Sequence, residues 1–455
     1  MPGRPRLVAA IAGSLAIVVA VGLVTGYLSV VPPGDPSAVA AAATPAPAAV
    51  PSAAATGTPP ASPTPSPTAT RPDPRPTATP PGTAPTPEPA APSANAALAR
   101  RLSAALVRYR ERQAIPGISV TMIFADGTTW TDAAGFSVLR DASEVTEETE
   151  FPAASMSKTF VAAAVLRLVE DGRIRLDEPV GARLPALGLD RRITIRMLLE
   201  HTSGLRDFFF HPRIDRALLA APDAEWTPQR SLRYVGKPYF RPGRGWHYSN
   251  TNYLVLGLLV EAVTGRPLAT VIRREFLDPL RLEDTYTQGV EKPRGPTAHG
   301  YRYASGAAAA RPVDVNGGTV VMPFRSVVTA AAGAGGIAST SGDLARWARA
   351  LYGGSVLEPT SLAQMIDASD TAPFQPRIAY GLGTQAVSID GRPAVGHSGR
   401  FLGFRGVMRW LPNERIAIVV LTNQSRRDPA VVARQLLRVV FGPPPKPAPS
   451  TTPSP

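Results

Sequence analysis

The chain of 455 residues carries a formal net charge of +13 and contains 50 prolines and no cysteine. The absence of cysteine excludes disulfide bonds, thiol catalysis and a lipidated cysteine anchor. The positive charge comes from scattered arginines without a basic motif or an aromatic platform, so the sequence indicates no nucleic-acid partner.

The N-terminal residues form a candidate membrane segment. Arg4 and Arg6 precede the stretch 7–31, which contains no charged side chain. A helix of that length would span roughly 37 Å, enough to cross a bilayer, and the arginines ahead of it favour a cytoplasmic N-terminus. We therefore expect residues 1–31 to be a signal anchor of a single-pass membrane protein with an extracytoplasmic catalytic part. The alternative is secretion after cleavage near Ala40, where small residues fit a signal peptidase.

Two segments have a composition that is typical of disorder. Residues 32–94 consist mainly of alanine, proline, threonine and serine, and the tail 442–455 has the same character. Such segments cannot bury enough apolar surface to fold. We predict a disordered linker over 32–94, a disordered tail over 442–455 and one folded domain over 95–441.

The strand signals lie at both ends of this domain. Runs rich in β-branched and aromatic residues flank short turns there, whereas the segments between them are mainly helical in pattern. The expected strands are 118–124, 128–132, 404–410 and 416–421, and the expected outer helices are 98–109 and 429–441. The pattern predicts an α/β (α+β) fold, in which an antiparallel sheet from both ends of the domain is flanked by helices and joined by a mostly helical insertion.

A first candidate for catalysis is Ser155, followed three residues later by Lys158. The apolar run 159–166 predicts a helix that begins near Ser155, so the two side chains, about one turn apart, can face the same point. Serine becomes a good nucleophile when a neighbouring base takes its proton, and a desolvated lysine can be neutral enough to do so. Taken alone, the pattern also fits a capped helix with an exposed lysine.

Two further polar motifs stand beside predicted elements. Tyr248 and Asn250 precede an apolar helical run, where a tyrosine hydroxyl can relay a proton and an asparagine amide can hold a substrate amide. Residues 396–400, with the sequence Gly-His-Ser-Gly-Arg, precede the last hairpin, and their small side chains would let a substrate backbone pair along the strand edge. A helix cap and a plain tight turn are the alternative interpretations.

Together, in this order, the three motifs resemble those of the serine β-lactamase and penicillin-binding D-Ala-D-Ala carboxypeptidase superfamily, whose signature is S-x-x-K, a central S-D-N or equivalent, and K-T-G. The Tyr-x-Asn motif is similar to that of the branch that contains class C β-lactamases. The resemblance covers essentially residues 95–441. Further stretches that fit the family are 176–179, 197–205 and 335–340.

The resemblance implies a role for each matching residue. The implied catalytic residues are Ser155 as the acylated nucleophile, Lys158 as its base and Tyr248 as an aid to proton transfer. The implied substrate-binding residues are Asn250, His397, Ser398 and Gly399. The implied oxyanion hole consists of the backbone N–H groups of Ser155 and Arg400. The histidine spacing suggests no metal site, and the sequence has no H-E-x-x-H motif and no phosphate loop, so we expect no metal and no cofactor.

His397 is the main departure from the lactamase pattern. Lactamases of this branch carry lysine there, whereas carboxypeptidases and several other members resemble this chain in having histidine. An ordinary histidine pKa of about 6.5 would give His397 a partial positive charge, and hence a pH-dependent hold on a substrate carboxylate. We therefore expect a serine hydrolase of D-Ala-D-Ala carboxypeptidase type that acts on peptidoglycan peptides. The alternatives are an esterase, a hydrolase of D-amino-acid peptides, a β-lactamase or a non-catalytic envelope-binding module.

Overall fold

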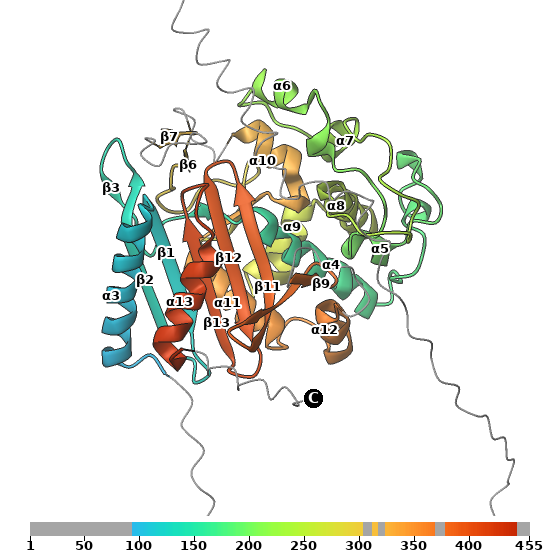
Figure 1. Cartoon of the computed structure of the whole chain (residues 1–455). Coiled ribbons are helices and arrows are strands. Elements are labelled where there is room, and N and C mark those ends of the chain that lie inside the picture. Colours follow the sequence, from blue (N-terminus) through green and yellow to red (C-terminus); the bar gives the residue numbers. More distant parts are fainter. Residues whose placement is uncertain (1–92, 304–311, 317–323, 369–377, 444–455) are drawn as a thin grey trace, which may run out of the picture. The chain divides into compact units, whose positions relative to one another are not determined.

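The computed structural model describes residues 93–303, 312–316, 324–368 and 378–443 (Figure 1). The predicted anchor 1–31 and nearly all of the predicted linker and tail lie outside these ranges. Within them, no single helix is long and apolar enough to cross a membrane, although the bent pair Asn250–Thr264 and Leu268–Leu277 passes by length and composition together. The first helix of that pair is largely buried among other helices.

An eight-stranded antiparallel sheet organises the described chain, in the order β3-β2-β1-β13-β12-β11-β10-β9. β1 pairs with β13, with Val120 opposite Val420, so the two ends of the domain meet in the middle of the sheet. This confirms the predicted fold. The strands are β1 (Gly117–Ile123), β2 (Thr129–Val138), β3 (Ser143–Glu144), β9 (Ile378–Tyr380), β10 (Gln385–Ile389), β11 (Arg392–Phe401), β12 (Phe404–Leu411) and β13 (Ile416–Thr422).

Two terminal helices cover one face of this sheet. α3 (Ala96–Gln113) and α13 (Pro429–Phe441) lie side by side, α3 against β2 and α13 against β12 and β13 (Figure 1). Leu102, Leu106 and Leu436 are buried in the same apolar cluster as Val120 and Val420. Leucines four residues apart lie on one helix face, which explains why the sequence pattern predicted α3.

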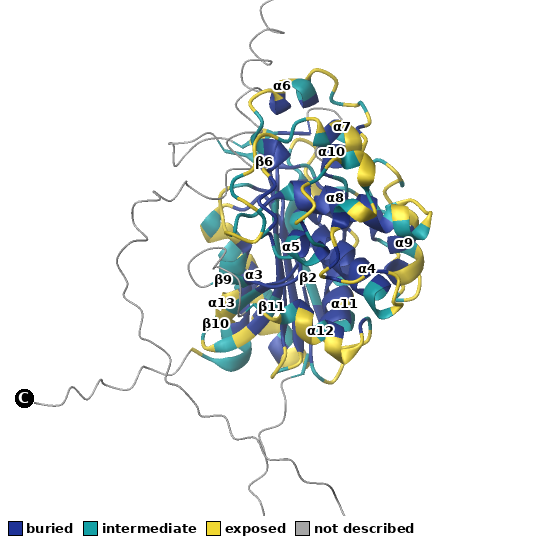
Figure 2. Cartoon of the chain, turned by 90° about the vertical axis from the view of Figure 1, so that its right-hand side faces the viewer, coloured by how far each residue is buried: buried dark blue, intermediate teal, exposed yellow. Residues whose placement is uncertain are grey.

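The insertion is helical and packs on the other face. Its elements are η2 (Ala154–Met156), α4 (Ser157–Glu170), η3 (Val180–Ala182), η4 (Pro185–Leu187), α5 (Ile195–Leu199), η5 (Phe208–Phe210), α6 (Ile214–Leu219), α7 (Pro228–Leu232), α8 (Asn250–Thr264), α9 (Leu268–Ile272), η6 (Arg273–Leu277), α10 (Arg325–Ala331), η7 (Ala332–Ala334), α11 (Ser341–Tyr352) and α12 (Pro359–Ile366). Figure 2 shows α4 and α8 mostly buried and α6 and α7 partly exposed.

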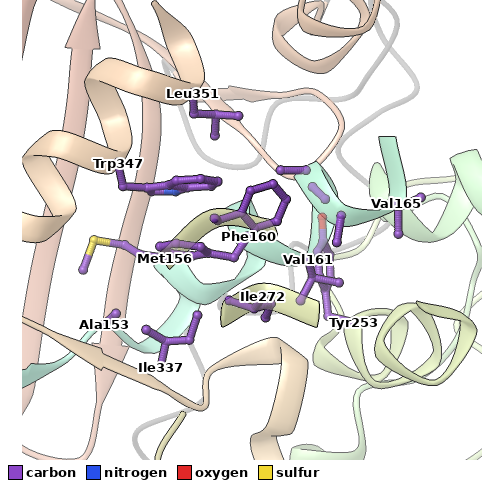
Figure 3. Close-up of a cluster of buried hydrophobic side chains, with 14 of the residues drawn as sticks. Ala153, Met156, Phe160, Val161, Val165, Tyr253, Ile272, Ile337, Trp347 and Leu351 are labelled. Atoms are coloured by element: carbon purple, nitrogen blue, oxygen red, sulfur yellow. The ribbon is translucent and has the colours of Figure 1, made fainter. Parts of the chain in front are cut away.

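Helix α4 is held firmly inside this core. The rings of Phe160 and Trp347 stack with centroids 4.0 Å apart (Figure 3), and the Trp347 indole donates a hydrogen bond of 2.9 Å to the Thr159 hydroxyl. The three-stranded sheet β4-β8-β5, formed by Phe151–Pro152, Ile337–Ser339 and Tyr286–Thr287, lies beside the start of the helix. The helix that follows Ser155 is therefore fixed by packing along most of its length.

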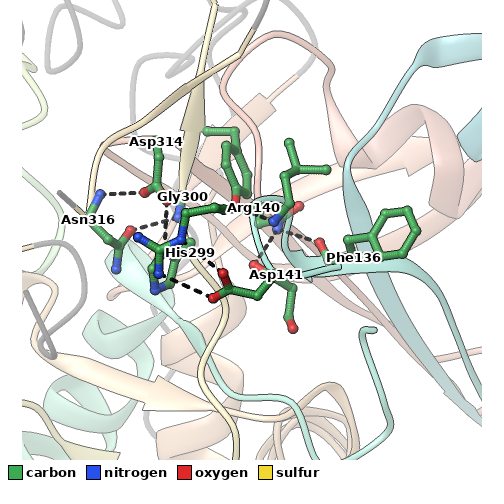
Figure 4. Close-up of polar contacts among 11 residues, drawn as sticks. Phe136, Arg140, Asp141, His299, Gly300, Asp314 and Asn316 are labelled. Carbon is green, nitrogen blue, oxygen red and sulfur yellow. Dashed lines mark hydrogen bonds and ion pairs between the residues drawn. The ribbon is translucent and has the colours of Figure 1, made fainter. Parts of the chain in front are cut away.

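A polar cluster joins the hairpin β6 (Tyr301–Arg302) and β7 (Val313–Asp314) to the main sheet (Figure 4). The Tyr301 hydroxyl accepts a hydrogen bond of 2.7 Å from the backbone N–H that follows β2, at Leu139. The His299 imidazole lies 2.7 Å from the Asp314 carboxylate. These contacts anchor the connection between β5 and α10.

Candidate active site

Ser155 lies on the one-turn helix η2, directly before α4. Its hydroxyl-bearing side chain is half-buried, and both neighbours, Ala154 and Met156, are buried. Ala154 adopts a φ of 49°, a region that non-glycine residues seldom occupy. Strained backbone of this kind persists where the surrounding structure holds it, and here it presents Ser155 at the end of a buried helix.

Lys158 is completely buried and points at Ser155. Its Nζ lies 3.1 Å from Ser155 Oγ, 2.8 Å from Asn250 Oδ1 and 2.6 Å from the Ala334 carbonyl oxygen. Burial lowers the pKa of Lys158 to about 7, although the nearby Asp207 carboxylate opposes that shift. Near neutral pH, a substantial fraction of this lysine is therefore an uncharged amine.

The three contacts of Lys158 favour its action as a base. The Asn250 amide oxygen and the Ala334 carbonyl oxygen can only accept hydrogen bonds. They therefore take the two N–H groups of the neutral amine, and the nitrogen lone pair is left facing the Ser155 hydroxyl. This arrangement lets the amine accept the serine proton as the hydroxyl oxygen attacks.

Asp207 fixes the orientation of Asn250. One carboxylate oxygen of Asp207 accepts hydrogen bonds from the Asn250 side-chain amide at 2.7 Å and from its backbone N–H at 3.0 Å. The amide nitrogen of Asn250 thus faces Asp207, and its oxygen faces Lys158. Asn250, predicted to bind the substrate amide, has a second amide N–H that can still donate to a substrate.

Sequence reasoning missed Asp207, which is buried two residues beyond the stretch 197–205. Desolvation raises the pKa of its carboxyl group, while hydrogen bonds from Asn250 and Phe209 and the charge of Lys158 oppose that shift. In the sequence, the only feature that could have indicated Asp207 is its position shortly after the stretch 197–205, which fits the family.

Tyr248 completes the group around the nucleophile. Its hydroxyl is hydrogen-bonded to Ser155, and Lys158 Nζ lies 5.0 Å from the centre of its ring. Burial raises the pKa of Tyr248 far above its ordinary value, with a smaller contribution from the charge of Asp207. The phenol therefore stays protonated at physiological pH and can act as a hydrogen-bond donor rather than as a tyrosinate base.

The motif at 396–400 lies in β11, next to the turn that carries Ser155. A Cβ atom at Gly399 would lie 2.3 Å from the Ala153 carbonyl oxygen, so glycine is what allows the strand to approach η2 this closely. On the β10 side of β11, the backbone ladder ends at Gly396. Ser398 N–H points to that side, where it meets Gln385, and Arg400 N–H, two residues on, faces the same way.

His397 differs from the sequence-based expectation in its charge. The ring is buried, with Nδ1 2.6 Å from the Ser398 carbonyl oxygen and Nε2 3.0 Å from the Tyr380 hydroxyl. A carbonyl only accepts, so Nδ1 carries the proton and Nε2 accepts from Tyr380. Burial, and secondarily the charge of Lys158, lowers the pKa of His397 to about 3. The expected partial positive charge is therefore wrong, because desolvation outweighs the ordinary basicity of imidazole.

A permanent cation does lie behind β11, and the sequence analysis missed it as well. Buried Arg409 donates a hydrogen bond of 2.8 Å to the Gln385 amide oxygen, which also accepts from the Ser398 N–H. Burial lowers the pKa of Arg409 only to about 10, so the side chain remains charged at neutral pH. Arg409 is therefore linked to the edge of β11 by Gln385, which contacts both the guanidinium group and Ser398.

His201 supports the loop that carries Tyr248. Its Nδ1 accepts hydrogen bonds from Ser249 N–H at 3.2 Å and from the Asn252 amide at 3.0 Å, and its ring centre lies 4.3 Å from that of Tyr248. Burial lowers the pKa of His201 well below its usual value, so the ring is neutral. Among the described residues, no group of three or more histidine and carboxylate side chains is placed to hold a metal ion.

The pKa of about 7 for Lys158 predicts the pH dependence of turnover. Because the amine must be unprotonated to accept the serine proton, kcat/KM should fall about tenfold per pH unit below pH 7 and level off above it. His397 should contribute no limb between pH 5 and 8. A pH–rate profile on a chromogenic ester checks both points, and a limb that disappears in His397→Asn would contradict them.

The profile of the Beta-lactamase family matches residues 96–441 of this sequence. The chain belongs to the beta-lactamase family. This match confirms the predicted superfamily of β-lactamases and penicillin-binding proteins. The individual roles assigned to Ser155, Lys158 and Tyr248 remain predictions.

Several known proteins are similar to this chain. The unguisins hydrolase ungD' of Aspergillus campestris is 29% identical over 69% of the chain and 60% of its own length. Penicillin-binding protein 4* of Bacillus subtilis is 28% identical over 64% of each protein. The crystal structure of a D-stereospecific amidohydrolase from Streptomyces sp. shares 27% identity over 76% of this chain and 98% of that one, with a TM-score of 0.63. The chain spans less than two thirds of the first two proteins.

Proposed function

We propose that this protein hydrolyses an amide bond next to a D-amino-acid residue through an acyl-enzyme on Ser155. The observation that carries the proposal is the buried Lys158 amine, which contacts Ser155 Oγ at 3.1 Å and has a pKa lowered to about 7. The preference for D-residues is supported by the similarity to a D-stereospecific amidohydrolase and to a D-aminopeptidase of Brucella ovis.

The proposed reaction has two steps. In acylation, Ser155 Oγ bonds to the substrate carbonyl carbon and its proton passes to Lys158, while the Ser155 and Arg400 backbone N–H groups stabilise the oxyanion. The C–N bond then breaks, and the leaving nitrogen takes up a proton delivered with the help of Tyr248. In deacylation, water adds to the ester carbonyl, its proton passes to the same base and Ser155 leaves as the hydroxyl.

A peptide ending in D-Ala-D-Ala is the first candidate substrate, since the chain resembles penicillin-binding proteins. A D-amino-acid amide or D-aminopeptide without a free carboxylate beside the scissile bond is the second. The neutral His397 favours this second candidate, because it supplies no charge to hold a substrate carboxylate. A D-Ala-D-Ala peptide would need a cation near its C-terminal carboxylate. Arg409, which is hydrogen-bonded to Gln385 at the strand edge, is the side chain that can supply this charge.

A substrate panel distinguishes the candidates. We expect turnover of D-phenylalanine amide to exceed that of L-phenylalanine amide by at least about 100-fold. In the L-enantiomer, a side chain bound in the same position would misplace the carbonyl carbon relative to Ser155. The same assay is run on a D-Ala-D-Ala peptide with a free C-terminal carboxylate and on the same peptide with that carboxylate converted to an amide. The ratio of the two rates measures how much turnover depends on the carboxylate charge. Equal rates on the D- and L-amides would contradict the proposed stereospecificity.

We further propose that the hydrolase works outside the cytoplasm. The support is the uncharged stretch 7–31 behind Arg4 and Arg6, followed by a linker without large apolar side chains over much of its length. Protease treatment of intact cells should remove the catalytic domain from a membrane-bound protein. An N-terminal sequence that begins after Ala40 would instead establish cleavage and secretion, and full protection from protease would refute export.

A further inference from the structure

A cavity of about 220 Å³ lies beside the catalytic helix and is separate from the nucleophile. Its walls are mainly apolar and come from α4, α8, α9, β8 and the segment before α7. The principal apolar side chains are Val161, Trp226, Leu254, Leu268, Ile272 and Ile337. Figure 3 shows Ile272 beside Val161, with Ile337 on the adjoining strand. Ser155 is not among the residues that line this space.

The mouth of the cavity indicates an uncharged ligand. Val290 lines it and is 64% exposed, which makes it one of three large apolar side chains exposed in the described part of the chain. Glu225 forms an ion pair with Arg325 at 2.7 Å, and Glu261 accepts a hydrogen bond of 2.9 Å from the Leu268 N–H. Both carboxylates at the cavity therefore already have protein partners, and the rest of the lining is mainly apolar, with a few uncharged polar groups such as the hydroxyls of Thr287 and Thr329.

The volume limits the size of the ligand. An engineered apolar cavity of about 150 Å³ in another protein stays dry and binds benzene. The present cavity is larger, at about 220 Å³, and has a similar aliphatic and aromatic lining. A single aromatic ring with a short alkyl group therefore matches both its size and its chemistry.

The inner wall of the cavity connects directly to the catalytic base. Ala332, Gly333 and Gly336 line the cavity, and between them the Ala334 carbonyl accepts the hydrogen bond of 2.6 Å from Lys158. Ala332 has a φ of 42°, which is strained for a residue with a side chain. A Cβ at Gly333 would lie 2.8 Å from the backbone oxygen of Tyr253 and 3.2 Å from the side chains of Leu268 and Val161, so the turn packs tightly against α8 and the cavity wall. A displacement of this turn therefore moves the acceptor that holds the amine.

We propose that this cavity binds a small uncharged molecule with one aromatic ring, and that its occupancy changes the rate of acylation through the turn 332–336. The rate effect rests on the proposed role of Lys158, whereas the binding does not. The site is distinct from the place where the substrate carbonyl must lie, because its lining excludes Ser155.

Toluene is a suitable probe for the full-length chain. At about ten times its dissociation constant, it should raise Tm by about 2 °C. Ala269→Phe places a ring in the cavity, since Ala269 lines it, and should abolish the shift. Thr270→Phe is the matched control, because Thr270 is exposed on the same helix and does not line the cavity. With a chromogenic ester, toluene should change kcat at least twofold in the wild type and in Thr270→Phe, but not in Ala269→Phe.

Each part of the proposal has its own refutation. No shift in the wild type, or a shift that persists in Ala269→Phe, would overturn the binding site. If Ala269→Phe does not fold, Val290→Trp closes the mouth from an exposed position and must abolish the shift instead. Binding without any change in kcat or in the acid limb of the pH profile would overturn the coupling. If no ester is hydrolysed, the proposed function fails, while the melting shift still decides the site.

Discussion

Lys158→Met should lower kcat/KM by about 10³- to 10⁴-fold, the upper range for loss of a general base. Methionine is close to lysine in length and suits the buried position, but it has no lone pair of comparable basicity to take the proton from Ser155. Since the substitution leaves the oxyanion donors in place, KM should change much less than kcat. Steady-state kinetics on a chromogenic ester measure both.

Lys237→Met is the control for this variant, because Lys237 is an exposed lysine in the connection before Tyr248. It should retain turnover within about twofold. If Lys158→Met kept more than a tenth of the wild-type kcat with an unchanged acid limb, another group would have to be the base. Intact mass after incubation with a reactive ester shows whether the loss lies in acylation, since the variant should then accumulate no adduct.

The same variant has a readout in stability. The folded pKa of Lys158 is lowered to about 7, whereas an unfolded lysine titrates at about 10.4. Between these values the unfolded chain binds one more proton, so the free energy of unfolding contributed by this group rises with pH from 7 to 10. Lys158→Met should lose that rise, and denaturant melts at pH 7 and pH 9 measure the difference.

Local pattern was enough to predict the centre of the fold. Strand 118–124 is rich in β-branched residues and strand 416–421 is a nearly continuous apolar run, and they pair in the middle of the sheet. The strands β9 and β10 were not predicted. They are short, and their place at the edge of the sheet depends on the pairing of β10 with β11 and of β9 with β10, which no local pattern reveals.

The candidate site divides in the same way. Ser155 and Lys158 come together because three residues make about one helical turn, so their contact follows from spacing. The charge of His397 was mispredicted because it depends on burial by segments far away in sequence, including Tyr380. Asp207 was missed because its role also depends on a contact between residues distant in sequence. One of its carboxylate oxygens accepts a hydrogen bond from Asn250, which lies in another part of the insertion.

Asp207→Asn should lower kcat/KM by about 100-fold, the size of loss that a misplacement of about 1 Å at a reacting group can cause. One Asp207 oxygen accepts from the Phe209 N–H and the other from Asn250, so an amide at this position must turn its nitrogen toward one of these donors. Where that nitrogen faces Asn250, the Asn250 amide must rotate to avoid two opposed donors, and its oxygen then leaves Lys158. The variant therefore removes an acceptor of the catalytic amine without touching Ser155.

The pH profile separates this effect from simple loss of structure. Because the Asp207 charge raises the pKa of Lys158, its removal should move the acid limb of kcat/KM to lower pH. Asp223→Asn, at an exposed carboxylate between α6 and α7, should leave both the rate and the limb unchanged. A folded Asp207→Asn variant with a lower rate but an unmoved limb would show that the carboxylate acts only through Asn250. A limb that moves upward would contradict the charge argument, since removing an anion near a buried cation cannot make the cation easier to form.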